Sequence, residues 1–300
     1  MMHRYGSVAA DLALRLLAMA PGDRLDSVGN LAAAFGTGRG TVQSALQLLQ
    51  REEAVVLESR GSLGSFVTRL DQQKLLTLAG LIPLIGVMPV PYSLRFQGLA
   101  TGLNRAFARA DLPLVLAHLR GAKNRLHFLR TGRCDFAVIS RLAWEEEQAQ
   151  GDLRQVAAFG PGSNVGNHVL LLTAGAREGI ADGMRVGVDA SSHDHLRLTM
   201  QECQGKQVEL VPISYAEAMP RLLAGEIEAA LWDAGVPLPP GSPLVIQSRQ
   251  QSLPSDDTEA VLVTRLEPPT LGNLIAARLD AALVREVQER VAAGLETPTF

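Results

Sequence analysis

Residues 27–49, SVGNLAAAFGTGRGTVQSALQLL, constrain the fold of this chain most, because glycines divide them into two short helices. Ser27 is a favourable N-cap, since its hydroxyl can accept a hydrogen bond from an unpaired amide of the first helical turn. Apolar side chains at helical spacing are expected to form the inner face of this helix: Leu31, Ala34 and Phe35. Gly36 and Gly38 then end the helix and predict a tight turn.

A second helix is expected to begin near Arg39. Apolar residues one turn apart form its inner face: Val42, Ala45, Leu46 and Leu49. The opposite face carries short polar side chains and one arginine: Arg39, Gly40, Thr41, Gln43, Ser44 and Gln47. Two helices joined in this way are typical of a helix-turn-helix, whose second helix lies in the major groove of DNA and contacts phosphates and base edges. Because similar hairpins occur in many enzymes, these residues alone leave a purely structural role open.

Two strand-like runs follow at residues 55–58 and 65–67, and a glycine-containing turn joins them, so the sequence predicts a winged helix. The segment from Gly36 to Val67 resembles the winged-helix domain of the GntR superfamily of bacterial transcription regulators. The resemblance implies DNA contacts by the reading helix and by the wing: Arg39, Gly40, Thr41, Gln43, Ser44, Arg60, Gly61 and Gly64.

The sequence departs from the GntR pattern at two positions. Gly40 places a weak helix former inside the reading helix, at a cost of roughly 1 kcal/mol relative to alanine. Glu53 stands where the family usually has a helix-ending glycine. Neither departure removes a residue that the family pattern places at the DNA.

The charge of the chain argues against binding nucleic acid by bulk electrostatics, because its formal net charge is -3. The first 70 residues carry seven arginines against six acidic residues, and no acid lies between Asp26 and Glu52. The predicted reading surface therefore does not repel phosphate, but it offers few cations. We expect one monomer to bind double-stranded operator DNA weakly and a homodimer to be needed for useful affinity.

The N-terminal segment has a basic start and a small-residue end, which superficially indicates a signal peptide. Asp11 and Arg15 interrupt its apolar part, so we expect instead a first helix of the DNA-binding domain. No apolar stretch is long enough to span a membrane. Cys134 and Cys203 are too few and too distant for a metal site or a disulfide framework. We expect a cytoplasmic protein with reduced thiols and without membrane, metal or cofactor.

The chain divides into a DNA-binding domain at residues 1–70, a linker helix at 71–82 and a larger domain at 83–300. Leu75, Leu76 and Leu78 of the linker are expected to pack on either domain or on a second subunit. The larger domain alternates short apolar strands with amphipathic helices, which indicates a parallel α/β sheet. Strands are expected at 84–88, 114–117, 136–139, 169–172, 186–188, 208–211, 229–232 and 260–263. Helices are expected at 96–107, from 124, at 193–203, 215–223 and 271–293.

Two segments of this domain echo each other, and each has a glycine three residues before an acid: Gly132 with Asp135, and Gly225 with Glu228. Each predicts a helix that a left-handed glycine ends before a buried strand. Two such sets suggest two similar lobes, and the domain resembles the type 2 periplasmic-binding-protein fold, which also occurs in effector domains of LysR-type regulators. Lobe I is placed at about 83–160 and 255–300, and lobe II at about 168–250.

The combination of a GntR-like winged helix-turn-helix with such a sensor closely resembles the YhfZ family of transcription regulators, over nearly the whole chain. The similarity is strongest at residues 88–92, 98–103, 117–122, 137–143 and 296–300.

A ligand is expected beyond the carboxyl ends of the strands, where helix N-termini offer free amides. The candidate contacts are Pro91, Tyr92, Arg120, Gly121, Ser140, Arg141, Asp189, Ser191, Ser192 and Trp232. Arg120 and Arg141 can each hold an oxyanion with two donors, and the serines can add donors from lobe II. The sequence therefore predicts a small anionic effector.

Other roles stay open for several of these residues. Ser191 or Ser192 can be an N-cap alone, and Arg141 can pair with the acidic run at 145–147. His118 can be a structural histidine. The glycine-rich segment at 160–168 lacks the lysine and the following helix of a phosphate loop, so a hinge or crossover between lobes fits better.

An effector-responsive transcription regulator is the function that these features favour, and we expect no catalytic residues. The alternative is an enzyme with an appended DNA-binding domain. None of the three lysines lies on a convincing Schiff-base loop, and neighbours such as Ser192, His193 and Asp194 on one helix cannot face each other as a triad must. An exported solute receptor is disfavoured by the interrupted N-terminal segment.

Overall fold

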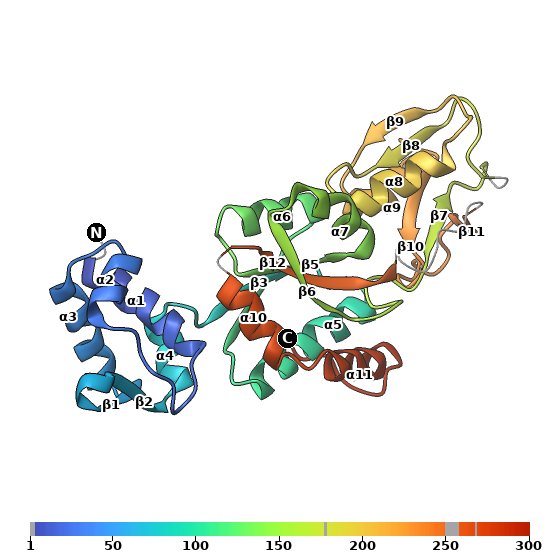
Figure 1. Ribbon diagram of the computed structural model, residues 1–300. Helices are drawn as coiled ribbons and strands as arrows, with labels where there is room; N and C mark the ends of the chain where they lie inside the picture. Colours follow the sequence, from blue (N-terminus) through green and yellow to red (C-terminus); the bar gives the residue numbers. More distant parts are fainter. Residues whose placement is uncertain (1–3, 177–178, 250–257, 268) are drawn as a thin grey trace. The chain divides into compact units, whose positions relative to one another are not determined.

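The computed structural model describes residues 4–176, 179–249, 258–267 and 269–300 (Figure 1). The described residues form two compact units, one within residues 1–84 together with Asp111–Pro113, and the other of Ile85–Ala110 together with the described part of residues 114–300. The lobe boundaries predicted near residues 250 and 255 lie outside the described residues.

The first unit contains the predicted helices and hairpin: α1 (Arg4–Leu17), α2 (Val28–Ala34), α3 (Arg39–Arg51), β1 (Val55–Ser59), β2 (Ser65–Leu70) and α4 (Gln72–Leu78). Its core joins Leu12 and Leu16 of α1 to Leu31 of α2 and Leu49 of α3. The prediction that Ala34 faces inward is wrong, because the neighbouring Ala32 takes the buried position and Ala34 is exposed.

Capping fixes both ends of the helix-turn-helix. The Ser27 hydroxyl accepts a hydrogen bond from the amide of Asn30 at 3.2 Å, as the sequence predicts. Glu53, which follows α3, adopts a φ of 56°, the left-handed region that favours glycine. Its carboxylate binds Lys74 Nζ at 2.9 Å, and this hydrogen bond and charge lower the pKa of Glu53. Glu53 therefore stands at the position where the GntR pattern has a helix-ending glycine, and it adopts the left-handed backbone conformation that a glycine would have there.

The wing is an antiparallel hairpin of β1 and β2 with a short 3-10 turn, Gly61–Leu63, at its tip. Gly61 and Gly64 have φ values of 59° and 95°, so the turn needs glycine at both positions. The Arg60 guanidinium lies 4.5 Å from the Phe66 ring centroid and pairs with Glu58 at 2.8 Å. These contacts hold the wing arginine on the hairpin.

The linker helix α4 packs within the first unit. Asp71 caps α4 by accepting a hydrogen bond from the Lys74 amide at 3.1 Å. Leu75 is fully buried in the core that contains Leu12, Leu31 and Leu49. Of the packing partners that the sequence left open, the structure therefore selects the N-terminal unit for Leu75.

Lobe I of the second unit is a five-stranded sheet with helices on both faces, in the strand order β4-β3-β5-β12-β6. Its strands are β3 (Leu84–Met88), β4 (Leu114–His118), β5 (Phe136–Ser140), β6 (Leu153–Ala158) and β12 (Ala260–Arg265). Helices α6 (Ala122–Arg130) and α7 (Arg141–Glu147) lie on one face, and α5 (Leu94–Arg109), α10 (Pro269–Arg278) and α11 (Ala281–Ala292) on the other (Figure 1).

Lobe II is a second five-stranded sheet, in the order β11-β7-β10-β8-β9. Its elements are β7 (His168–Leu172), β8 (Arg185–Val188), α8 (His193–Glu202), β9 (Glu209–Pro212), a 3-10 turn (Tyr215–Glu217), α9 (Ala218–Leu223), β10 (Ala229–Asp233) and β11 (Val245–Ser248). Alternate residues of β7 enter two cores, Leu170 with Cys203 beyond α8, and Leu171 with Leu222 of α9. The two helices therefore cover opposite faces of this sheet.

The prediction of a purely parallel sheet is wrong, because the sheet of each lobe contains one antiparallel strand. In lobe I, β12 runs antiparallel to β5, with Leu262 opposite Val138. In lobe II, β7 runs antiparallel to β10, with Leu231 opposite Leu170. Both strands follow a change of lobe in chain order, since β7 comes after β6 of lobe I and β12 comes after β11 of lobe II. Two α/β lobes that exchange strands in this way form the type 2 binding-protein fold predicted from the sequence.

The glycines of the two echoing segments have the predicted backbone conformation, since φ is 69° at both Gly132 and Gly225. The predicted helix at 271–293 is instead two helices, α10 and α11. Asp280 starts the second by accepting a hydrogen bond from the Leu283 amide at 3.0 Å. The segment at 160–168 connects β6 to β7 and so crosses from lobe I to lobe II.

Helices α5 and α11 pack backbone to backbone at two glycines of α5. A Cβ added at Gly98 would lie 2.8 Å from the Gln288 carbonyl oxygen, and one at Gly102 would lie 2.6 Å from the Val284 carbonyl oxygen. Backbone atoms cannot rotate away as a side chain can, so these positions require glycine.

We predict that Gly102→Ala destabilises the second unit by about 1–3 kcal/mol through overpacking, although alanine is the better helix former. Gly40→Ala in α3 is the matched control, because nothing lies within 4 Å of the added Cβ. It should raise the stability of the first unit by up to about 1 kcal/mol. Amide hydrogen exchange measures the two units separately, and equal gains at both positions would contradict the packing described for α5.

Candidate ligand-binding site and DNA-reading surface

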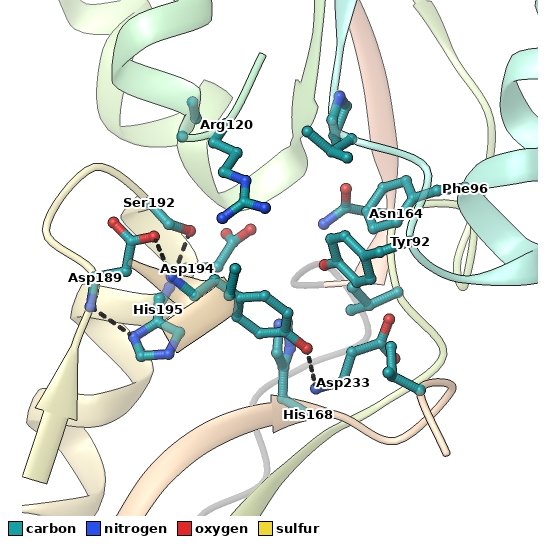
Figure 2. A pocket seen from close by; sticks show the side chains of 18 of the residues that line it. Tyr92, Phe96, Arg120, Asn164, His168, Asp189, Ser192, Asp194, His195 and Asp233 are labelled. Carbon is teal, nitrogen blue, oxygen red and sulfur yellow. Dashed lines mark hydrogen bonds between the residues drawn. The ribbon is translucent and has the colours of Figure 1, made fainter. Parts of the chain in front are cut away.

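A cavity of about 210 Å³ lies between the two lobes of the second unit (Figure 2). Loops after the strands of both lobes line it, together with α6, the start of α8 and the crossing segment that contains Asn164 and Val165. Its volume is below the range of about 300–1,000 Å³ that holds drug-sized ligands. The cavity is therefore suited to a small metabolite.

Three aromatic rings form one wall of the cavity. Tyr92 stacks on Tyr215 with ring centroids 5.0 Å apart, and Tyr215 stacks on Trp232 at the same separation. Phe96 meets Tyr92 edge to face at 5.2 Å. The Tyr215 hydroxyl accepts a hydrogen bond from the Asp233 amide at 3.0 Å, and burial raises the pKa of this hydroxyl. The wall is neutral at ordinary pH and offers a flat apolar surface to a ligand.

Two arginines of lobe I face the cavity. Arg125 in α6 is 6% exposed, and its Nε and Nη1 donate hydrogen bonds to the carbonyl oxygens of Val138 and Leu119, both at 2.8 Å. Burial lowers the pKa of Arg125 to about 10, so the guanidinium is still cationic at neutral pH. Arg120 is more exposed and extends into the cavity from the loop before α6 (Figure 2).

Two carboxylates of lobe II face the same cavity. Asp194 accepts a hydrogen bond from the Ser140 hydroxyl at 2.7 Å, and Asp233 accepts one from the Gly235 amide at 2.9 Å. Burial raises the pKa of both carboxyl groups. No ion pair within 4.0 Å joins either carboxylate to an arginine in the described parts of the chain.

Asp189 organises the lobe II loop before α8 and has its hydrogen-bonding capacity filled. One carboxylate oxygen accepts from the amide and hydroxyl of Ser191, at 2.9 and 2.6 Å, and the other accepts from the Tyr215 amide at 3.0 Å. The Asp189 amide donates to Nδ1 of His195 at 3.1 Å, which leaves the proton of the neutral imidazole on Nε2. Burial lowers the pKa of His195 to about 4, so this ring is neutral at pH 7.

The lobes touch each other around the cavity. The Lys123 amide donates to the Ser191 carbonyl oxygen at 3.2 Å, and Ser140 of lobe I binds Asp194 of lobe II. Gly121 makes the closest approach, because a Cβ there would lie 2.4 Å from the Ser191 hydroxyl oxygen. Its φ of 74° also favours glycine. These contacts describe a closed arrangement of the two lobes.

The structure brings together most of the ligand contacts proposed from the sequence. Those that line the cavity are Tyr92, Arg120, Gly121, Asp189, Ser192 and Trp232. Ser140 and Ser191 lie beside it, where the Ser140 hydroxyl binds Asp194 and the Ser191 hydroxyl binds Asp189. Pro91 lies outside the lining, where its carbonyl oxygen accepts a hydrogen bond from Gln97.

The structure does not bring Arg141 to the cavity. Its guanidinium binds Glu259 on the segment before β12, with Nη2 to Oε2 at 2.6 Å, and it also reaches Gln155 of β6. The acidic run at 145–147 is not its partner either. A carboxylate 118 positions later in the chain thus pairs with Arg141 and holds its guanidinium away from the cavity.

Several lining residues are not among the contacts proposed from the sequence: Phe96, Arg125, Asn164, His168, Asp194, His195, Tyr215 and Asp233. One signal was available for Arg125, because it falls on the helix face shared by Ala122, Leu126 and Leu129. An arginine on the inner face of an amphipathic helix indicates a buried cation that needs a partner. His118, left as a structural histidine, contacts the Pro89 carbonyl oxygen at 3.3 Å and stacks edge-on against Phe300.

The neighbours Ser192, His193 and Asp194 do not converge. Ser192 caps α8 by accepting from the His195 amide, His193 Nδ1 binds Glu146 at 2.6 Å, and Asp194 binds Ser140. Among the described residues, no group of three or more His, Cys, Asp and Glu side chains has the geometry to hold a metal ion. None of the helices in the described ranges is long and apolar enough to cross a membrane.

The reading surface proposed from the sequence is solvent-accessible on α3. Arg39, Gln43, Ser44 and Gln47 are exposed, and Thr41 is half-buried, while the opposite face of the helix is in the core. The wing residues proposed with them are also accessible: Arg60, Gly61 and Gly64. Arg24, which pairs with Phe66 as an isolated bridge beside the wing, adds a cation that the sequence reading did not include.

Comparison with known proteins identifies both parts of the chain. A family model of the YhfZ C-terminal domain matches residues 71–300, and a model of a helix-turn-helix domain matches residues 20–67. The protein YhfZ of Escherichia coli K12 is 33% identical over an alignment 301 residues long, which covers 98% of this chain and 97% of the relative.

Two solved structures extend the comparison. YhfZ from Shigella flexneri is 31% identical, with a TM-score of 0.60 over 72% of this chain and 93% of that chain. The periplasmic domain of BvgS from Bordetella pertussis is 14% identical, with a TM-score of 0.50 over 87% of this chain and 54% of that chain, and it shares the fold alone. The YhfZ resemblance is thereby confirmed, and the chain belongs to the YhfZ family, with a helix-turn-helix domain ahead of a two-lobed domain of binding-protein type.

Proposed function

We propose that this protein is a transcription regulator whose affinity for operator DNA is controlled by a small anionic metabolite bound between the lobes of its second unit. The observation that carries the proposal is the buried guanidinium of Arg125, which faces the cavity between the lobes and has no carboxylate within ion-pairing distance in the described ranges. A cation in that position favours an anionic partner, because burial of an unpaired charge is costly.

The DNA-binding part of the proposal is supported by the helix-turn-helix match and by the exposed polar face of α3. Arg39 stands in the first turn of this helix, where residues of a reading helix contact base edges and phosphates. The wing supplies Arg60, and the neighbouring Arg24 supplies a further cation for the DNA backbone. Since each monomer offers few cations, we propose that a homodimer binds two half-sites.

The ligand part of the proposal gives each lobe a role. Arg120 and Arg125 of lobe I hold the anionic group, and Asp189 keeps the Ser191 and Ser192 loop of lobe II in place at the other side. A ligand that bridges the lobes favours the closed arrangement in which Gly121 meets Ser191. Control of DNA binding then follows if the closed and open forms space the two reading helices of a dimer differently.

We propose that this action involves no catalysis. The divergent side chains of Ser192, His193 and Asp194 support this view, since a nucleophile and its base must lie within hydrogen-bond reach of each other. Turnover of a bound metabolite by the purified protein would instead favour an enzyme with an appended DNA-binding domain.

The first prediction concerns the reading helix. Operator duplexes are selected from random DNA with the purified full chain, and binding of the selected site is measured as a function of salt. Arg39→Ala should weaken binding by about ten- to hundredfold and reduce the salt slope by about one, because one arginine contact to DNA is lost. Arg51→Ala is the control, since Arg51 is an exposed arginine at the other end of α3. Equal losses in both variants would show that Arg39 has no special place at the DNA.

The second prediction concerns lobe closure. The small-molecule fraction of a cell extract should raise the melting temperature of the wild-type protein and release or strengthen its operator complex. Gly121→Ala should abolish this response while leaving DNA binding without extract intact, because the added methyl group overlaps Ser191 in the closed form.

Gly132→Ala is the matched control for this test. Gly132 has a similar φ of 69°, but the nearest atom to its added Cβ is 3.9 Å away, on the Arg265 side chain. A response of Gly121→Ala equal to that of Gly132→Ala would mean that contact between the lobes is not part of ligand binding.

A further inference from the structure

The cavity presents unpaired groups of opposite charge from its two lobes. On lobe I, Arg125 uses Nε and Nη1 for backbone carbonyl oxygens, and its Nη2 has no hydrogen-bond partner among the described residues. On lobe II, Asp233 uses one carboxylate oxygen for the Gly235 amide, and its Oδ2 has no partner there either. Both side chains are more than nine-tenths buried, at 6% and 2% exposed.

Asp194 repeats this pattern in the first turn of α8. One of its carboxylate oxygens accepts from Ser140, and its charge interacts with Arg125 across a separation greater than 4 Å. Asp189 differs from the other two acids, because backbone and hydroxyl donors fill both of its oxygens. The carboxylates that are left for a ligand are therefore Asp194 and Asp233.

No ion pair within 4.0 Å joins these acids to Arg125 in the described ranges, and the charges of His168 and Arg95 lower the pKa of Asp233 against the effect of burial. A buried cation and a buried carboxylate without ion pairs in one cavity each carry a desolvation cost, which a ligand removes only if it brings the opposite charge to each of them. A purely anionic ligand would pair with Arg125 but would leave Asp233 unpaired and bring a like charge closer to it. A ligand with both charges, held a few bonds apart, pairs with both groups and adds no net charge.

We propose that the ligand is a zwitterionic amino acid or a close analogue, whose carboxylate binds Arg120 and Arg125 and whose ammonium group binds Asp233 and Asp194. This inference rests on the proposed function and refines it: the anionic group proposed there is the carboxylate of a ligand that also carries an ammonium group. The side chain of the amino acid lies on the wall of Tyr92, Tyr215 and Trp232, which favours an apolar or planar group.

The size and the hydrogen-bonding groups of the cavity agree with this class. A volume of about 210 Å³ accommodates a single small metabolite and leaves little room for a peptide or a nucleotide. The Asp233 backbone is held by the hydroxyl of Tyr215, the central ring of the wall. The carboxylate and the aromatic surface are thus fixed relative to each other, as recognition of an ammonium group next to a side chain requires.

The test compares compounds that differ by one charged group. The common L-amino acids are added singly, at millimolar concentration, to the full-length protein, and the melting temperature is measured. Each amino acid that stabilises the protein is then compared by calorimetry with its deaminated acid and its decarboxylated amine, for example L-leucine with 4-methylpentanoate and 3-methylbutylamine. We expect at least one amino acid to bind, and both partial compounds to bind at least tenfold more weakly.

The variant Asp233→Asn locates the ammonium site. It should weaken binding of the amino acid by about ten- to hundredfold, the equivalent of one charge-assisted hydrogen bond, and leave binding of the deaminated acid unchanged or stronger. Asp194→Asn should act in the same direction. Asp182→Asn is the control, because Asp182 is an exposed acid of lobe II that accepts a hydrogen bond from the Gln207 amide. Equal losses for the acid and the amino acid in Asp233→Asn would overturn the assignment of this residue.

The outcomes separate this inference from the proposed function. If the deaminated acid binds as tightly as the amino acid and changes operator affinity, the zwitterion is wrong and the anion-controlled regulator stands. If no common amino acid stabilises the protein, the inference is overturned, whatever the cell-extract experiment shows. If an amino acid binds as expected but never changes operator affinity, the ligand class holds and the regulatory function is wrong.

Discussion

The buried guanidinium of Arg125 is the constraint on which the proposed ligand site of the second unit depends. Two backbone carbonyl oxygens, of Leu119 after β4 and Val138 in β5, hold the guanidinium at the carboxyl edge of the lobe I sheet. Burial lowers its pKa to about 10 from the ordinary arginine value, so the folded protein keeps a proton there at a free-energy cost. A ligand anion would offset that cost only inside the cavity, and this is the physical basis of the proposed charged effector.

Closure of the lobes depends on close contacts between them at positions with small side chains. Gly121 has no side chain and faces Ser191, and the Ser140 hydroxyl both caps α7 and binds Asp194 across the gap. Lobe I therefore supplies the cations from a loop and helix whose N-terminus touches lobe II, and lobe II supplies the acids from the ends of its own elements. A ligand that spans the two sets adds contacts that exist only in the closed form, which is the requirement for shifting such an equilibrium.

Local features of this fold could be predicted from the sequence, and features set by distant residues could not. Ser27 as a cap, the left-handed glycines Gly132 and Gly225, and the apolar strands depend on a few neighbouring residues, so the pattern of the sequence contains them. The direction of β12 is set by its antiparallel pairing with β5 and β6, which lie more than 100 positions away in the sequence, and the place of Arg141 depends on Glu259. The candidate site was found in part for the same reason: strand ends indicated Arg120 and Trp232, whereas Arg125 and Tyr215 enter the cavity from helical turns that follow the strands.

The energy that such a switch needs is small compared with what the cavity offers. A tenfold change in operator affinity corresponds to about 1.4 kcal/mol of difference in ligand binding between two forms of the protein. One charge-assisted hydrogen bond made only in the closed form contributes about 1.5–3 kcal/mol. A single contact across the cavity, such as that proposed for Asp233, would therefore be sufficient for control. This small difference is enough because the proposed DNA-binding surface of α3 carries few cations and its affinity for DNA is expected to be modest. A DNA-binding domain that bound DNA more tightly by charge alone would need a larger difference in ligand-binding free energy to be released. Its affinity would depend less on the spacing of the two domains in the proposed dimer.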